Sequence, residues 1–175
     1  MKITNKYVFF WKEKPFCNFT RCRIKYEWPD SKDGEAIYFS SSEQMFMWFK
    51  AIYFGDFVIA DKILQTDDPE TARRLGREVK NYDDEVWNTE RVYWMLQAVS
   101  AKFMQNKNLR KQLCDPKYDN LTFVEASPYD KIWGIGFNEN IAEDNQEIWG
   151  KNNLGTILNH VRAICKEHKD ILDND

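Results

Sequence analysis

The sequence has few of the residues that bind transition metals. Zinc sites in proteins use Cys and His ligands at short, regular spacings. Here the two histidines both lie near the C-terminus and the four cysteines form no C-x-x-C pair; these residues are His160, His168, Cys17, Cys22, Cys114 and Cys165. The chain also lacks the dinucleotide-binding fingerprint G-x-G-x-x-G. The sequence therefore predicts no metal site and no cofactor.

Long apolar runs without charge are also missing. No uncharged stretch reaches the roughly 18 residues that a membrane-spanning helix needs. The N-terminus, M-K-I-T-N-K-Y-V-F-F-W-K-E-K, lacks the apolar core and the cleavage site of a secretory signal. Unpaired thiols without such a signal are typical of a reducing compartment. We therefore expect a cytoplasmic protein with no membrane partner.

The chain has no excess of positive charge. It carries 25 basic and 28 acidic residues, well mixed, for a net charge of −3. Such a balance excludes a global basic field that would attract nucleic acid, although a local basic site remains open. A length of 175 residues, 43% of them hydrophobic, suits one compact domain that buries roughly 70% of its unfolded surface. Seven Trp, eight Tyr and twelve Phe suit both a core and stacking against flat rings.

Short strands and longer helices alternate in the pattern of apolar residues. Arg21–Trp28 alternates strictly between polar and apolar side chains, which predicts a half-buried strand. A turn over residues 29–34 and a return strand, Glu35–Phe39, should complete a small antiparallel sheet. Leu121–Ala126 is a further strand, and helical patterns fill most of the remaining chain. The sequence predicts a mostly helical α+β domain in which Met45–Phe54 is central.

Two charged residues share one face of this central, otherwise apolar helix. Glu43 and Lys50 are seven residues apart, which places them about two turns, or roughly 10 Å, from each other along the axis. Buried charges of this kind need partners, so they serve either the fold or a ligand. Ser40 and Glu43 fit the S-x-x-E capping box, and Lys50 can extend along apolar neighbours to water. We favour the functional interpretation of the pair because other motifs accompany it.

Several other polar and aromatic residues are candidates for ligand contacts. Arg77 and Arg91, on predicted helices, have guanidinium groups suited to phosphate, although most helix arginines are simply solvated. Asn18 fits either a turn or a ligand contact. In Ser127–Gly136, Asp130 fits a capping turn or a role beside Trp133, while glycines let the backbone approach a ligand closely. The N-terminus of the last helix, after Gly150, is a candidate anion site.

Taken in order, these pieces resemble the NADAR domain family, which includes the riboflavin-intermediate N-glycosidases. The resemblance covers about residues 10–162, and the ordered set is far more specific than any one piece. The matching motifs are F-C-N-F at Phe16–Phe19, S-S-S-E-Q-M-F-M-W-F-K-A at Ser40–Ala51, L-G-R at Leu75–Arg77, W-x-x-x-R at Trp87–Arg91, K-F-x-Q-N at Lys102–Asn106, E-A-S-P-x-D-x-x-W-G-x-G at Glu125–Gly136 and W-G-x-N-x-L-G at Trp149–Gly155.

The resemblance implies an enzyme that hydrolyses an N-glycosidic bond between a base and a phosphoribosyl or ADP-ribosyl group. Such substrates include amino-pyrimidine ribose phosphates of the riboflavin pathway and ADP-ribose attached to guanine of DNA, which makes ADP-ribosylated DNA an expected partner. The family's site residues are carried over as follows: Glu43, Lys50 and Asp130 for catalysis, and Asn18, Arg77, Trp87, Arg91, Glu125, Trp133 and Gly134 for substrate binding.

The expected chemistry suits these residue types. Departure of the base develops positive charge at C1 of the ribose. Glu43 or Asp130 can stabilise this charge as a carboxylate or protonate the leaving base as an acid. Burial among aromatic side chains should lower the pKa of Lys50 and make its amine a nucleophile that forms a Schiff base. Trp87 and Trp133 are the expected stacking residues. The alternative is a non-catalytic ADP-ribose or NAD-binding module, which would not need Glu43 and Lys50 together.

Overall fold

The computed structural model describes residues 1–27 and 36–172. Its contacts gather into two units, one made of residues 1–17 and 107–175 and the other of residues 18–106. The turn predicted over residues 29–34, together with Trp28 and Glu35 of the flanking strands, lies outside the described residues. The expectation of a single domain over the whole chain stays a prediction.

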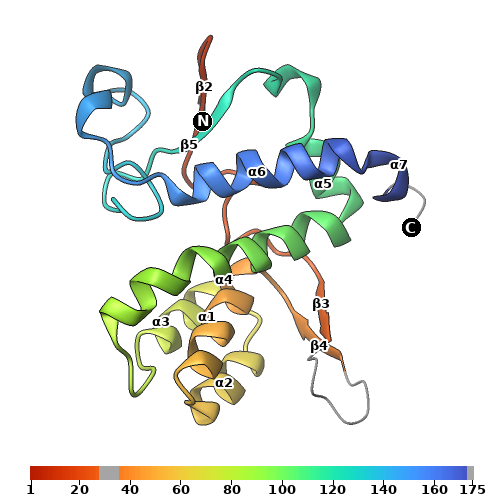
Figure 1. Ribbon diagram of the computed structural model, residues 1–175, viewed down its shortest axis with the longest axis vertical. Coiled ribbons are helices and arrows are strands. Elements are labelled where there is room, and N and C mark those ends of the chain that lie inside the picture. The colour runs from red at the N-terminus through yellow and green to blue at the C-terminus, as the bar shows by residue number, and fades with distance from the viewer. Residues whose placement is uncertain (28–35, 173–175) are drawn as a thin grey trace. The chain divides into compact units, whose positions relative to one another are not determined.

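The described residues of the unit 18–106 form four helices and a strand pair (Figure 1). Strands β3 and β4 pair antiparallel, as the alternating pattern predicts, and Ile24 of β3 is fully buried. Helix α1 packs against each of the other three helices, so the predicted central position of this segment is confirmed. The elements are β3 (Ile24–Glu27), β4 (Ala36–Phe39), α1 (Ser42–Tyr53), α2 (Phe57–Leu64), α3 (Pro69–Gly76) and α4 (Asp84–Gln105).

Local side-chain chemistry sets where these helices begin. At each N-terminus a side-chain oxygen accepts a hydrogen bond from the amide three residues later, which satisfies a donor that the helix itself leaves open. Gly55, with a φ of +71°, lies in the break between α1 and α2. The capping residues are Ser41 for α1, Asp56 for α2, Asp68 for α3 and Asp83 for α4. The predicted start of α3 at Asp68-Pro69-Glu70 is therefore confirmed.

The core of this unit is aromatic. The ring centroids of Phe49 and Trp94 are 4.8 Å apart, and those of Phe49 and Tyr26 are 5.3 Å apart. Trp48 packs against Phe39 of β4 with centroids 5.4 Å apart. Contacts at these distances join the strand pair to α1 and α4 and add about 0.5–1.5 kcal/mol per pair beyond the burial of area.

The unit of residues 1–17 and 107–175 combines a three-stranded sheet with a long helix. Strand β1 pairs antiparallel with β2, and β2 pairs parallel with β5, with Val8 opposite Phe123. A parallel pair needs a long connection, and more than one hundred residues separate β2 from β5 in the chain. The elements are β1 (Lys2–Ile3), β2 (Tyr7–Phe10), α5 (Lys107–Leu113), η1 (Pro116–Tyr118), β5 (Thr122–Glu125), η2 (Glu143–Ile148), α6 (Asn153–Glu167) and α7 (Lys169–Leu172).

Side chains near and within α6 close the free edge of β5. Asn159 Oδ1 accepts the amide of Phe123, and Asn152 Oδ1 accepts the amide of Glu125. The Asn152 amide group also donates to the Phe123 carbonyl at 3.1 Å. These bonds occupy backbone groups that an open strand edge would present to another chain.

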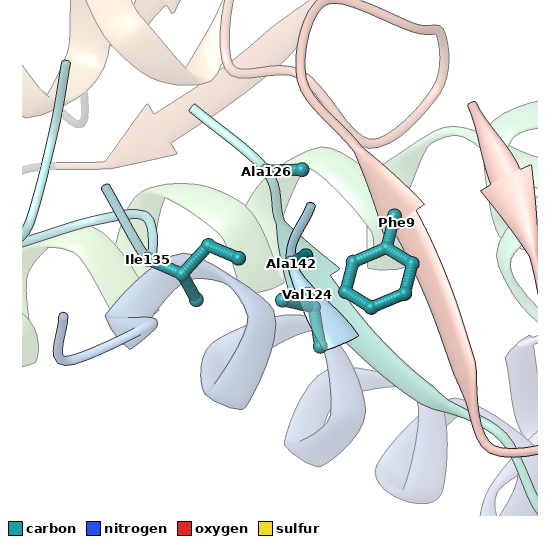
Figure 2. Close-up of a cluster of buried hydrophobic side chains, with 5 residues drawn as sticks. All are labelled: Phe9, Val124, Ala126, Ile135 and Ala142. Carbon is teal, nitrogen blue, oxygen red and sulfur yellow. The ribbon is translucent and has the colours of Figure 1, made fainter. Parts of the chain in front are cut away.

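A buried apolar cluster lies on one side of this sheet. Figure 2 shows Phe9 of β2 beside Val124 of β5, with Ala142 next to them and Ile135 and Ala126 at the border. Trp149 covers the cluster, with its ring centroid 5.9 Å from that of Phe9. The indole N–H of Trp149 donates to the Ala142 carbonyl, so its polar edge is satisfied as well.

The overall class is therefore α+β and mostly helical, as predicted, and the strands of the described residues form two small sheets in place of one. Among the described residues, none of the helices combines the length and the apolar character needed to cross a membrane.

Candidate functional site

Glu43 is buried in the first turn of α1, but it does not fill the capping box. The helix begins one residue later than Ser40 predicts, because Ser41 is the N-cap and accepts the Gln44 amide at 3.1 Å. The side chain of Gln44 then reaches back and accepts the Ser40 amide at 2.6 Å. Ser40 is therefore not the N-cap, and the expected capping box from Ser40 to Glu43 is wrong. Glu43 itself is only 6% exposed.

Asn18 is held against this same turn. Its backbone carbonyl accepts the Glu43 amide at 3.2 Å, and its side-chain oxygen accepts the Ser42 hydroxyl at 3.0 Å. The Asn18 amide group donates to the sulfur of Met95 at 3.3 Å. Sulfur is a weak acceptor. The side-chain NH2 group of Asn18 is therefore fixed in position but makes only a weak hydrogen bond there.

Two turns further along α1, the Lys50 amine contacts a backbone carbonyl and an aromatic ring. Its Nζ donates to the Gly76 carbonyl at 2.8 Å and lies 4.0 Å from the centre of the Tyr82 ring. Burial lowers the pKa of Lys50 to about 8, and the positive charges of Arg91 and Arg77 act in the same direction, while Asp84 opposes them. The predicted lowering of the Lys50 pKa is therefore confirmed. At about 8, a fraction of the amine is neutral at physiological pH.

Glycine at position 76 makes the contact with Lys50 possible. A Cβ atom at Gly76 would lie 2.0 Å from the sulfur of Met47 and 3.2 Å from its Cβ, so a side chain there would require Met47 to move. Met47 projects from α1 between Glu43 and Lys50, so glycine lets the end of α3 approach this helix without displacing Met47. The same approach brings the exposed Arg77, which caps the end of α3, into electrostatic range of the amine.

Arg91 is a third charged residue near Lys50, after Arg77, and is itself buried. Its Nε donates to the Trp87 carbonyl at 3.3 Å, and its Nη2 forms an ion pair with Asp84 at 3.1 Å. The Tyr82 hydroxyl donates to the same Asp84 oxygen. Tyr82, Asp84 and Arg91 therefore form a hydrogen-bonded chain next to Lys50. The sequence alone gave no signal for Tyr82 or Asp84, because their closeness to Lys50 comes from the packing of α4 against α1.

Trp87 does not have the role that was predicted for it. Its ring is 4% exposed and packs against Phe46, Tyr53 and Phe54, with centroids 5.5, 5.8 and 5.9 Å away. A ring enclosed in this way has no face left for a base. The structure assigns Trp87 to packing between α1 and α4, where it supports the helix that carries Arg91.

A second set of predicted residues belongs to the loop of residues 127–136 in the other unit. One Asp130 oxygen accepts the amides of Ile132 and Trp133 at 2.7 and 2.8 Å. Asp130 therefore shapes this loop, which contains no helical turn. Trp133 is half-buried within it, and the binding roles of Trp133 and Glu125 and the catalytic role of Asp130 stay predictions.

Gly134 lets this loop pass very close to the end of β5. A Cβ atom there would lie 2.7 Å from the Glu125 carbonyl oxygen and 3.1 Å from that of Asp130. The following residue, Ile135, donates its amide to the same Glu125 carbonyl at 3.0 Å. The glycine thus serves the fold of the loop, and its predicted contact with substrate is untested.

The N-terminus of α6 is not an anion site. Consecutive amides of residues 150–154 donate to the carbonyls of residues 131–135, for example from Gly150 to Ile135 at 2.8 Å and from Leu154 to Trp133 at 3.1 Å. These amides have no capacity left for an anion. The motif at Trp149–Gly155 instead fixes the loop that carries Asp130 and Trp133.

Comparison with known proteins adds an independent line of evidence. The NADAR domain model matches residues 9–165. The chain is 35% identical to N-glycosidase R617 of Acanthamoeba polyphaga mimivirus, over 91% of this chain and 96% of that protein. It is 34% identical to protein irg-1 of Caenorhabditis elegans, over 98% of this chain and 79% of the other.

The fold also matches a solved structure. The NMR structure of the Escherichia coli protein YbiA superposes with a TM-score of 0.69 at 26% sequence identity, covering 96% of this chain and 89% of that one. This match extends across both units, and it agrees with the mostly helical α+β architecture described above.

Proposed function

The chain belongs to the NADAR domain family and is a hydrolase of N-glycosyl bonds, and we propose that its substrate carries a phosphorylated ribosyl group, either phosphoribosyl or ADP-ribosyl. One observation carries the proposal: a half-buried lysine with a lowered pKa lies in electrostatic range of two arginines. A nucleophilic amine and phosphate-binding guanidinium groups are the two functions that such a substrate requires.

Phosphate recognition falls to the two arginines in this proposal. Arg77 is exposed at the end of α3 and can turn its planar guanidinium toward a phosphate. Arg91 is buried and keeps one ion pair with Asp84, so it has further N–H donors to offer.

The chemical steps follow from the positions of Lys50 and Glu43. The neutral Lys50 amine attacks C1 of the ribose, the bond from C1 to the base nitrogen breaks, and the base leaves with a proton. Opening of the sugar ring gives an imine between C1 and Nζ, and water then hydrolyses the imine to release the sugar and the free amine. Glu43, roughly two helical turns from Lys50, stabilises the positive charge at C1 or transfers the proton. Asp130 belongs to the other unit, and its part in these steps stays a prediction.

A three-substrate assay tests this proposal. Purified protein is incubated separately with an amino-pyrimidine ribose phosphate, with NAD and with DNA that carries ADP-ribosyl guanine, and the released base is measured by chromatography. We expect release from at least one of them and loss of release in the Lys50→Arg variant, which keeps the charge but cannot form the imine.

Borohydride trapping tests the covalent step separately. Reduction during turnover should attach the sugar to Lys50 of the wild type, and peptide mass spectrometry should locate it there. Normal turnover by a folded Lys50→Arg protein would refute the covalent route and leave Glu43 to activate water. Release from an unphosphorylated nucleoside at an equal rate would refute the phosphate requirement.

A further inference from the structure

Asp84 places an exposed carboxylate at the edge of the cluster around Lys50. It lies in the first turn of α4, and 67% of its side chain is exposed. One oxygen, Oδ1, accepts the Tyr82 hydroxyl and Nη2 of Arg91. The other oxygen, Oδ2, accepts Nδ2 of Asn88 at 2.9 Å. Asp84 is therefore held in a defined position while much of its carboxylate meets solvent.

This carboxylate can accept one more hydrogen bond. An ionised carboxylate offers about four lone-pair sites, two on each oxygen. Among the described residues, two donors meet Oδ1 and one meets Oδ2, so one site on Oδ2 is open. The Tyr82 hydroxyl holds the pKa of this carboxyl below its usual value, with help from Asn88 and Arg91 and against the effect of burial. The group is therefore ionised at neutral pH and acts only as an acceptor.

A single tyrosine ring separates Asp84 from the proposed nucleophile. The Lys50 amine lies over the Tyr82 ring, 4.0 Å from its centre, while the hydroxyl at the end of the same ring donates to Asp84. Attack by the amine requires C1 of the ribose to lie about 3–3.5 Å from Nζ. A ribose is similar in size to the tyrosine ring, so its hydroxyl groups then come within reach of the carboxylate.

The charge of Asp84 is unfavourable for an anionic substrate unless that substrate also supplies a hydrogen-bond donor. The carboxylate lies 3.1 Å from the guanidinium of Arg91, and it repels a phosphate that binds this arginine. A ribose hydroxyl provides the compensating bond. The hydroxyl on C2 is the nearest one to C1 and therefore to the amine. Hydrogen bonds to this hydroxyl become stronger as positive charge develops in the transition state.

We propose that Asp84 binds the 2-hydroxyl group of the substrate ribose and thereby selects ribosyl over 2-deoxyribosyl phosphates. This role rests on the proposed function, because that function places C1 of the sugar at Lys50. Asp84 is then a specificity-determining residue that touches the substrate. If Asp84 only oriented Arg91 and Tyr82, its replacement would weaken the binding of both kinds of sugar equally.

The experiment uses ribose 5-phosphate and 2-deoxyribose 5-phosphate as probes, and calorimetry with the full-length protein gives a dissociation constant for each. The wild type should bind ribose 5-phosphate about tenfold more tightly, which is the low end for a hydrogen bond to a charged acceptor. In Asp84→Asn the carbonyl oxygen can still accept from Tyr82 and Arg91, but an NH2 group replaces Oδ2. The ratio of the two dissociation constants should therefore fall about tenfold.

Glu85→Gln is the matched control for the loss of charge. Glu85 is the other acidic residue in the first turn of α4 and is also exposed. Within the described part of the chain, Arg91 forms its ion pair with Asp84 and none with Glu85. The variant removes the same charge from the same helix turn and should keep the wild-type ratio. A similar fall of the ratio in both variants would indicate a general effect of charge and overturn the proposal.

The remaining outcomes are decisive as well. Equal binding of both probes by the wild type, or an unchanged ratio in Asp84→Asn, would overturn the role of Asp84 and leave the N-glycosidase function standing. If the wild type does not bind ribose 5-phosphate, this role is also refuted, and the base-release assay decides separately about the proposed substrate. If Asp84→Asn does not fold, as circular dichroism would show, Asp84→Ser takes its place with the same expected fall.

Discussion

The pH dependence of activity tests the proposed nucleophile most directly. Only the neutral amine of Lys50 can attack, and its pKa is lowered to about 8. About a tenth of the amine is then neutral at pH 7, compared with roughly three in ten thousand for an ordinary lysine. The lowered pKa thus increases the neutral fraction of the Lys50 amine at pH 7 by about 300-fold.

The sign of the pH profile follows from this protonation. Below the pKa the amine gains a proton and loses its lone pair, so kcat/KM should fall about tenfold for each pH unit below roughly 8 and level off above it. Initial rates of base release, measured from pH 5.5 to 10 with a substrate found in the three-substrate assay, give the midpoint. A midpoint near 10.5, or no rise between pH 6 and 8, would refute the reasoning.

Two neighbouring charges should move this midpoint in opposite directions. Arg77→Gln removes a positive charge that lowers the Lys50 pKa, so the midpoint should rise; Asp84→Asn removes a negative charge that raises it, so the midpoint should fall. An electrostatic change of about 1 kcal/mol corresponds to roughly 0.7 of a pKa unit, which a rate profile resolves. Shifts of the same sign in both variants would show that these charges do not act on the titrating group.

Four further predictions concern single residues. Glu43→Gln should lower the rate about 100-fold with little change in melting temperature, because Ser41 and not Glu43 caps the helix and glutamine keeps the size of the side chain; a matched loss of stability would point to a structural role. Trp133→Ala should weaken substrate binding by roughly 1–3 kcal/mol in calorimetry if the ring stacks on a base, and unchanged affinity would contradict that role. Phe49→Ala should cost about 3–5 kcal/mol of unfolding free energy in urea, since its ring is 2% exposed; a cost below about 1 kcal/mol would argue against its place in the core. Tyr82→Leu should move the activity midpoint to lower pH, because an aromatic face favours the charged amine, whereas Tyr82→Phe keeps the face and should keep the midpoint.

Features determined by a few neighbouring residues could be predicted from the sequence. Asp68-Pro69-Glu70 carries a complete helix start within three residues, and α3 begins there. The alternation around Ile24 gave the buried face of β3, because side chains of a strand alternate whatever the strand packs against. In both cases the deciding interactions lie within the segment itself.

The start of α1 shows where local patterns become ambiguous. S-S-S-E-Q contains two overlapping capping boxes, one from Ser40 to Glu43 and one from Ser41 to Gln44. Ser41 is the N-cap, and the Gln44 side chain accepts the Ser40 amide and donates to the carbonyls of Ile63 and Thr66, which belong to the following helix and its end. Those partners are about twenty residues away in the chain, so no reading of the segment alone could choose between the boxes.

Packing between segments distant in the chain also determined two features that the sequence could not predict: the accessibility of the α6 amides and that of the Trp87 ring. The amides that open α6 meet a loop from residues 131–135 and are therefore closed to anions. Trp87 has the residue type of a stacking platform, yet the aromatic side chains of α1 enclose its ring. The residue types indicated anion binding in one case and ring stacking in the other. Tertiary contacts determined whether the amides and the ring were accessible to a ligand.

The lowered pKa of Lys50 has to be explained against two contacts that oppose it. The Gly76 carbonyl and the face of the Tyr82 ring both stabilise the charged ammonium, and yet the pKa of the amine is lowered to about 8. Burial and the arginines on α3 and α4 must therefore outweigh them. It follows that the motif on α1 supplies the amine but cannot lower its pKa alone. The segments that contain Arg77 and Arg91 are part of the same chemical unit, which gives a physical reason for L-G-R and W-x-x-x-R to accompany the α1 motif in one chain.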